Sequence, residues 1–144
     1  PLLSLHVSLI MMAYALFAFT FLCGIVALTL QFFRPNQPLH VEHIQALHVI
    51  SRLFLYPALA LLGIGIFVGA IWANISWGRY WGWDPKEVWA LISFLCYAVA
   101  LHGTSLPWFR RPLNYHLYMT GAFLTVLMTY IGVNYFLGGM HSYA

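Results

Sequence analysis

The sequence predicts an all-helical membrane protein, a bundle of four transmembrane helices that forms one domain over residues 1–144. The chain is 62% hydrophobic and only 6% charged, whereas a soluble domain carries about 25% charged residues. Its mean hydropathy is +0.82. Its uncharged stretches are 1–33, 53–78, 88–109 and 112–144. Each holds the roughly 20 apolar residues that a helix needs to cross ~30 Å of hydrocarbon. We place the spans near 7–32, 53–74, 86–106 and 115–137.

Basic residues orient these spans. The links 33–52 and 107–114 carry four arginines: Arg34, Arg52, Arg110 and Arg111. The opposite side has only Arg79 and Lys86, each with acidic residues close by in the sequence. The positive-inside rule therefore places both chain ends, and the loop before the third span, outside the cytoplasm. A net charge of +3 is too small to indicate a nucleic-acid partner.

The third span has a clear start. Asp84 is in position to cap the helix, Pro85 suits the first helical position, and Glu87 completes a variant capping box. Four tryptophans crowd the same stretch, WGRYWGWDPKEVWALI at 77–92. Helix capping accounts for the Asp-Pro pair, but it does not account for the indoles.

Two histidines lie on the outer side with this loop. His6 precedes the first span, and His141 follows the fourth. Two imidazoles and a broad aromatic surface suit a flat, apolar, iron-bearing macrocycle, with axial nitrogen ligands and rings packed on the porphyrin. Arg79 and Lys86 are candidates to pair with its propionates. The alternative is that both histidines are interfacial residues, solvated at one edge.

A third histidine, His102, is predicted inside the membrane. It follows Pro85 by 17 residues, about 25 Å along a helix. An ionisable group at that depth is a functional candidate by default. The alternative is a neutral histidine near the inner headgroups, just before Gly103 and Pro107 end the helix.

The remaining histidines and both cysteines are assigned no chemical role. His40, His43 and His48 match no tight metal-ligand pattern, so a solvated amphipathic segment is expected there. His116 is expected to be interfacial. Cys23 and Cys96 lie in apolar runs and are interpreted as small core residues.

The tryptophan-rich stretch resembles the WWD signature of the haem-handling proteins of cytochrome c biogenesis. Three other segments are similar to the CcsA/ResC branch: LHVSLIMMAYALF at 5–17, AVALHGT at 98–104 and GVNYFLGGMHSYA at 132–144. The resemblance covers nearly the whole chain. The earlier helices of that family are absent, so we expect either that the chain is the carboxy-terminal portion of a longer protein or that those helices come from another polypeptide.

This resemblance implies a function. Haem b would be taken from the cytoplasmic side at a site with His102 and an earlier histidine, and then held outside by His6 and His141 as axial ligands. The WWD loop would contact it through Trp77, Arg79, Tyr80, Trp81, Trp83, Asp84, Lys86 and Trp89. Haem would be joined there to the CxxCH cysteines of apocytochrome c. The chain would act as part of a cytochrome c synthetase of the System II type, a haem lyase component.

The resemblance also implies a partner and a location. The partner would be a CcsB/ResB-type membrane protein, in a bacterial inner membrane or a thylakoid membrane. Three other functions remain as alternatives. One is a haem exporter of the CcmC kind, which delivers haem to a chaperone. Another is a b-type electron-transfer protein, which would need histidine pairs on facing helices. The last is a structural subunit with an interfacial tryptophan belt.

Overall fold

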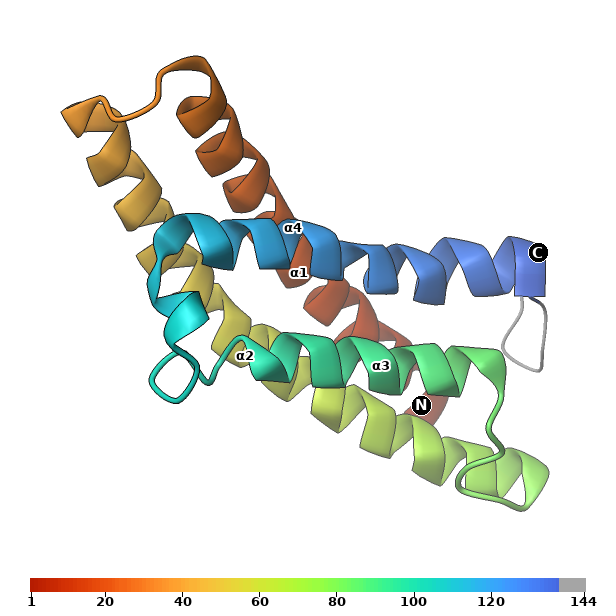
Figure 1. Cartoon of the computed structure of the whole chain (residues 1–144). Coiled ribbons are helices and arrows are strands. Elements are labelled where there is room, and N and C mark those ends of the chain that lie inside the picture. The colour runs from red at the N-terminus through yellow and green to blue at the C-terminus, as the bar shows by residue number, and fades with distance from the viewer. Residues whose placement is uncertain (138–144) are drawn as a thin grey trace.

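The protein is all-helical in the computed structural model, which describes residues 1–137 (Figure 1). Its α-helices are α1 (Leu2–Phe33), α2 (Pro38–Trp77), α3 (Pro85–Val99) and α4 (Pro112–Leu127). A short 3-10 helix, η1 (Pro107–Arg110), precedes α4, and a π-helix, η2 (Met128–Leu137), continues it. Among the described residues, three segments are long and apolar enough to cross a membrane: Leu2–Phe33, Pro38–Trp77 and Pro112–Tyr135. The chain is therefore a multi-pass membrane protein.

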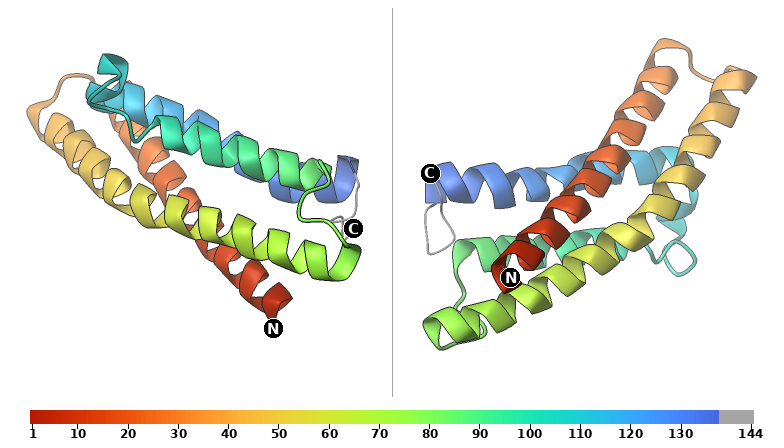
Figure 2. Two further views of the ribbon diagram at one scale, coloured as in Figure 1. Left: turned by 90° about the horizontal axis from the view of Figure 1, so that it is seen from below. Right: turned by 180° about the vertical axis from the view of Figure 1, so that it is seen from behind.

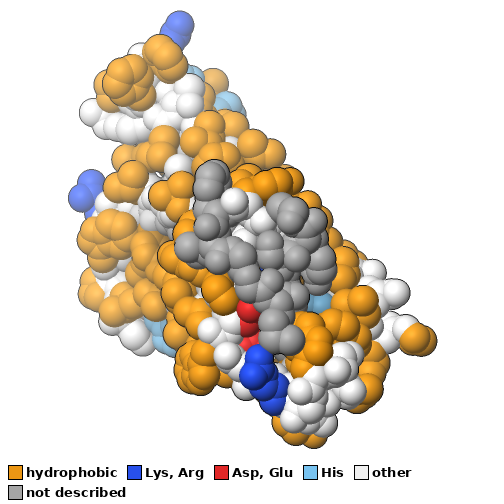
Figure 3. Space-filling view, turned by 90° about the vertical axis from the view of Figure 1, so that its right-hand side faces the viewer, with side chains coloured by type: hydrophobic (Ala, Val, Ile, Leu, Met, Phe, Trp, Pro, Cys, Tyr) orange, Lys and Arg blue, Asp and Glu red, His pale blue; other side chains and the backbone are white. Residues whose placement is uncertain are grey.

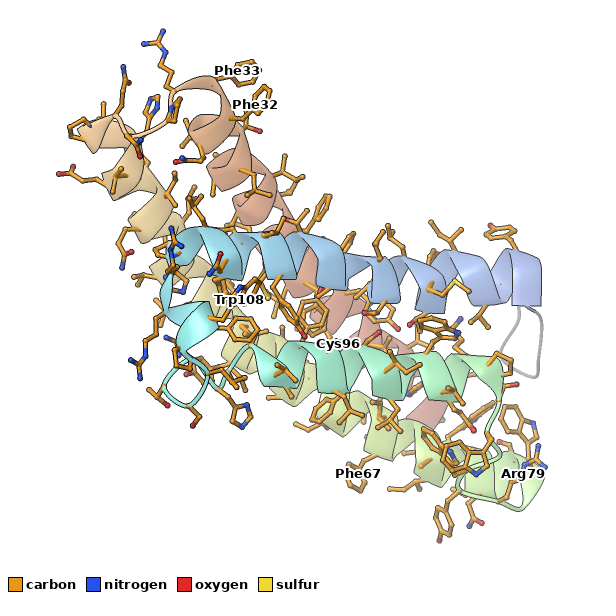
Figure 4. The ribbon with its side chains drawn as sticks, in the orientation of Figure 1. Phe32, Phe33, Phe67, Arg79, Cys96 and Trp108 are labelled. Atoms are coloured by element: carbon orange, nitrogen blue, oxygen red, sulfur yellow. The ribbon has the colours of Figure 1, made fainter. Side chains whose placement is uncertain are left out.

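Two antiparallel pairs make the bundle. The helices α1 and α2 form a hairpin whose tip projects beyond α3 and α4, and α3 and α4 run alongside each other (Figures 1 and 2). The core lies where the pairs meet: Phe17 of α1 stacks on Tyr97 of α3 with ring centroids 4.0 Å apart. Phe32, Phe33 and Phe67 point outwards (Figure 4) and are strongly exposed, as suits lipid-facing side chains.

The third predicted span, 86–106, is wrong at its end. The helix α3 has 15 residues, about 22 Å, which is short of ~30 Å of hydrocarbon. The amides of Ala100, Leu101 and His102 each bond to the carbonyl three residues earlier, at 3.1 Å. This tightened turn ends the helix before Gly103. The fourth crossing therefore stays a prediction.

The second span extends further than predicted. The helix α2 begins at Pro38 instead of near 53, so the inner link is mostly helical. His43 is exposed, as expected, and His40 is half-buried, but His48 is buried against α4, with its ring 4.5 Å from that of Tyr115. His116, expected at the interface, is fully buried. From the sequence, His48 and His116 lie near the ends of predicted spans. In the structure α2 packs against α4 at this point, and this contact buries both side chains.

Candidate functional site

A cavity of about 510 Å³ opens between the start of α1, the outer half of α2, the loop after α2, the start of α3 and η2. This volume falls within the range of small-molecule sites, roughly 300–1,000 Å³. Its lining combines apolar side chains with a few polar ones: His6, Val7, Ile10, Met11, Tyr14, Ile66, Gly69, Ala70, Tyr80, Trp81, Lys86, Glu87, Ala90, Thr129, Tyr130, Asn134 and Tyr135. Tyr80 and Tyr135 are 59% and 67% exposed, so they mark the mouth of the cavity.

The loop over the cavity is held by Glu87. Gly78, which follows the last residue of α2, has the left-handed conformation, with φ 79°, as is common for glycine at helix ends. The predicted capping box is confirmed: the Lys86 amide donates to Asp84, and the Asp84 amide donates to Glu87 Oε2 at 3.1 Å. The same Oε2 also accepts from the Gly82 amide at 2.8 Å. Glu87 therefore binds the backbone on both sides of Trp83.

Trp83 itself has a left-handed backbone, with φ 55°. That conformation costs a large non-glycine residue about 1–3 kcal/mol and persists only where its surroundings enforce it. The two hydrogen bonds to Glu87 supply this constraint. Trp83 is 70% exposed, and its ring meets that of Trp81 edge-on, with centroids 5.8 Å apart.

His6 presents a defined tautomer. Its Nδ1 lies 2.7 Å from the carbonyl oxygen of Gly65. Because a carbonyl only accepts, Nδ1 carries the proton, and the ring lone pair of the neutral imidazole is on Nε2. His102 has the same arrangement, with Nδ1 2.9 Å from the Ala98 carbonyl. Metal-ligating histidines commonly bond to a carbonyl in this way.

Lys86 forms the polar wall of the cavity. Its ammonium donates to Asn134 Oδ1 of η2 at 3.0 Å and lies 5.9 Å from the centroid of the Tyr130 ring. At this end of the molecule, acidic and basic side chains lie beside one another within a largely hydrophobic face (Figure 3). One flank of the cavity therefore carries a cationic group, and most of the remaining lining is aromatic or aliphatic.

The structure brings only some of the predicted site residues together. His6, Tyr80, Trp81 and Lys86 line the cavity, whereas five other predicted residues of the loop region do not: Trp77, Arg79, Trp83, Asp84 and Trp89. Trp77 packs on Trp72, with ring centroids 4.9 Å apart. Arg79 lies at the outer edge of the loop (Figure 4), with its guanidinium against Gly82.

The two remaining predicted ligands lie elsewhere. His141 falls outside the described residues. His102 follows the far end of α3 and is exposed instead of lying within a helix. Within residues 1–137, no three His, Cys, Asp or Glu side chains come together as a metal site.

Sequence reasoning missed several cavity residues on η2 and on α2. Asn134 and Thr129 are polar groups within an apolar segment, a signal that was available, because such groups inside membrane helices are usually functional or paired. The π-helical geometry that places them had no such signal. Gly69 belongs to a Gly65-x-x-x-Gly69 spacing, which is typical of close helix approach.

Comparison with known proteins identifies the family. The family model described as "Cytochrome C assembly protein" matches residues 1–141. The chain belongs to the cytochrome c assembly protein family. This confirms the resemblance found in the sequence.

Curated members of this family align closely with the chain. It is 44% identical over 147 residues to protein NrfI of Wolinella succinogenes, covering 99% of the chain and 16% of that protein. It is 44% identical over 110 residues to the cytochrome c biogenesis protein CcsA of Prochlorococcus marinus strain MIT 9515, covering 75% of the chain and 34% of the relative. The CcsA of Chlamydomonas reinhardtii is 35% identical over 142 residues, covering 98% and 40%. The matched regions thus make up 16% to 40% of the length of these relatives.

Proposed function

We propose that this chain binds haem b in the cavity beneath the tryptophan loop and presents it for covalent attachment to the CxxCH cysteines of apocytochrome c. The observation that carries the proposal is the joint presence of His6, Trp81 and Lys86 around one cavity. An imidazole, an indole and an ammonium match the iron, the ring face and a propionate of one substrate. Membership of the cytochrome c assembly family supports the same function.

The predicted ligands and the residues of the loop region then take these roles. His6 binds the iron through Nε2, and His141 supplies the opposite axial ligand. Tyr80 and Trp81 pack against the macrocycle. Lys86 pairs with a propionate, and Arg79 turns inward to assist it.

Besides Arg79, four predicted residues of the loop region lie outside the cavity and shape it from a distance. Asp84 caps α3, and Trp77 packs the end of α2. Trp83 and Trp89 extend the aromatic surface towards an incoming partner.

Attachment of haem to the cysteines requires the protein mainly to position the reacting groups. Thioether formation adds each cysteine S–H across a vinyl C=C bond: the sulfur bonds to one carbon, the hydrogen goes to the other, and no group leaves. The site therefore contributes by holding the vinyl edge open and by controlling the state of the iron. The exposed Tyr80 and Tyr135 at the mouth provide such an opening. This makes the chain a haem lyase component of the System II type.

The wider arrangement follows the same proposal. The helix α3 with residues 100–106 makes a fourth crossing, with the WWD loop and both chain ends outside the cytoplasm. His102, at the other end of α3, contributes to an inner haem site together with a histidine from another segment or from a CcsB/ResB-type partner. The membrane is a bacterial inner membrane or a thylakoid membrane.

One observation bears on the b-type electron-carrier alternative. His48 of α2 and His116 of α4 face each other inside the bundle, with ring centroids 6.1 Å apart. However, His116 donates Nε2–H to the Ile44 carbonyl at 3.2 Å, so its lone pair is on Nδ1, the nitrogen next to the main chain. Tyr115 also packs on the His48 ring. Because these contacts hold both rings against their neighbours, the synthetase function is preferred.

Imidazole rescue tests the proposal. His6→Gly and His141→Gly are expected to lose bound haem and its low-spin visible spectrum, and added imidazole is expected to restore both. His43→Gly, at an exposed position, is the matched control and should change neither. If the two glycine variants retain the wild-type spectrum, the axial roles are wrong.

A second experiment separates attachment from export. An apocytochrome with CxxCH replaced by AxxAH lacks the thiols, which only attachment needs.

A further inference from the structure

Two glycines of α2 form the surface on which His6 rests. Gly65 and Gly69 are four residues apart and therefore lie on one face of the helix. A Cβ atom at Gly65 would lie 2.7 Å from Ile10 Cδ1, and one at Gly69 would lie 2.5 Å from His6 Cε1 and 2.6 Å from His6 Nδ1. His6 and Ile10 are themselves one turn apart on α1. One turn of α1 thus lies in a groove that only the missing side chains provide.

The same groove gives the His6 ring access to a backbone carbonyl. In a helix the carbonyl of Gly65 accepts from the amide of Gly69, and its second lone pair is normally shielded by neighbouring side chains. Here the absence of a side chain at Gly69 lets the imidazole approach, and Nδ1 donates to Gly65 O at 2.7 Å. The two glycines act together: one supplies the acceptor and the other supplies the space.

We propose that Gly65 and Gly69 are positioning residues that fix the tautomer and ring plane of His6, so that Nε2 is the nitrogen that binds the haem iron. The proposal rests on the proposed function, because it requires His6 to be an axial ligand. An Nδ1–H···O=C bond orients a metal-bound imidazole and increases its basicity. A more basic axial ligand favours the ferric state and lowers the reduction potential of the bound haem.

The simpler explanation is that Gly65-x-x-x-Gly69 only packs α1 against α2. Small residues at this spacing are common where membrane helices approach closely. The two explanations make different predictions about what a methyl group at position 69 disturbs. Packing alone predicts lower stability, with the midpoint potential and spectrum of the haem that still binds unchanged. A positioning role predicts damage that is transmitted through the His6 ring.

A double-mutant comparison with imidazole separates them, using the protein purified from its own membranes. The variants are Gly69→Ala, His6→Gly and the double variant, with Gly121→Ala as the control, because nothing lies within 4 Å of a Cβ there. Gly69→Ala is expected to weaken haem affinity by about 10- to 100-fold, as loss of an outer-shell partner does. Its remaining haem should have a more positive midpoint potential and less low-spin signal. Gly121→Ala should match the wild type.

The potential and spectrum of Gly69→Ala separate positioning from packing, and the double variant shows whether the methyl group acts only through the His6 ring. With imidazole added, His6→Gly and His6→Gly/Gly69→Ala should recover equal haem affinity, because the clashing ring is gone. If Gly69→Ala alone does not fold, recovery of folded protein in the double variant shows that the methyl group acts against His6. A double variant clearly worse than His6→Gly would overturn the proposal in favour of packing, as would a Gly69→Ala protein with wild-type potential and spectrum. If His6→Gly itself keeps the wild-type spectrum, the proposed function has failed. That result differs from the two outcomes that would overturn only the positioning role.

Discussion

Lys86 Nζ and Asn134 Oδ1 lie 3.0 Å apart and join the first turn of α3 to the π-helix η2, 48 residues further along the chain. The bond closes one wall of the cavity. It also holds a cationic group at a fixed place inside a largely apolar site. In a π-helix each turn is wider than in an α-helix, and such segments are frequent at functional sites.

Changing Asn134 tests whether the Lys86 ammonium recognises a carboxylate of the substrate. Asn134→Asp places a competing negative charge beside the ammonium, whereas Asn134→Leu removes the hydrogen bond without adding a charge. We expect haem affinity, measured by titration of the Soret absorbance, to fall in the order wild type, Leu, Asp. The aspartate variant should bind about tenfold more weakly than the leucine variant, which corresponds to ~1.4 kcal/mol. Equal affinities in the two variants would show that Lys86 does not pair with a propionate.

Glu87 is expected to stabilise the conformation of the loop at residues 78–84. Its Oε2 accepts from the amides of Gly82 and Asp84, so Glu87→Ala frees the backbone around Trp83. Loss of such a cap costs about 1–2 kcal/mol, and the opened loop would be populated about 5- to 30-fold more. Limited proteolysis within residues 78–84 should speed up by that factor.

Two further variants control this experiment. Glu87→Gln keeps an acceptor oxygen and should lie between the wild type and Glu87→Ala. Glu42→Ala removes a carboxylate at an exposed position and should leave the cleavage rate unchanged. Uniform cleavage rates across all four proteins would mean that the capping bonds do not hold the loop.

The two neighbouring indoles should not be equivalent. Trp81 lines the cavity, whereas Trp83 is 70% exposed and does not. Stacking of an aromatic ring contributes about 0.5–1.5 kcal/mol beyond the area it buries. We therefore expect Trp81→Ala to weaken haem binding by about tenfold or more, and Trp83→Ala to weaken it by no more than about threefold. The Soret titration that measures Asn134 variants checks this order, and an effect of Trp83→Ala as large as that of Trp81→Ala would contradict it.

The sequence predicts the features that follow from local chemistry. Composition and apolar run lengths indicate a helical membrane protein, and Asp84, Pro85 and Glu87 indicate where α3 begins. The tryptophan-rich stretch identifies the family. These inferences succeed because capping, hydropathy and motif chemistry depend on residues that are close together in the chain.

Features that depend on packing between distant segments could not be predicted in the same way. The burial of His48 and His116 results from α2 crossing α4, which no local pattern specifies. The approach of His6 to Gly65 spans 59 positions. The early end of α3 depends on a change to tighter hydrogen bonds after Val99, and the residues there have no strong helix-stop signal before Gly103. The π-helical turn that directs Asn134 into the cavity also has no sequence signature.

Replacing His116 tests whether this buried histidine has a structural role or is a ligand of haem. Its ring is fully buried and its Nε2–H donates to the Ile44 carbonyl of α2 at 3.2 Å, so the side chain links α4 to α2. Replacing it with alanine loses this hydrogen bond and opens a cavity, with a cost of about 2 kcal/mol or more. His116→Ala should therefore lower the thermal midpoint of the purified protein while the visible spectrum of bound haem stays unchanged. His43→Ala, at an exposed position, should stay within about 0.5 kcal/mol of the wild type. A changed haem spectrum in His116→Ala would instead make the His48–His116 pair a ligand site, and the preference for the synthetase function over the electron carrier would then be wrong.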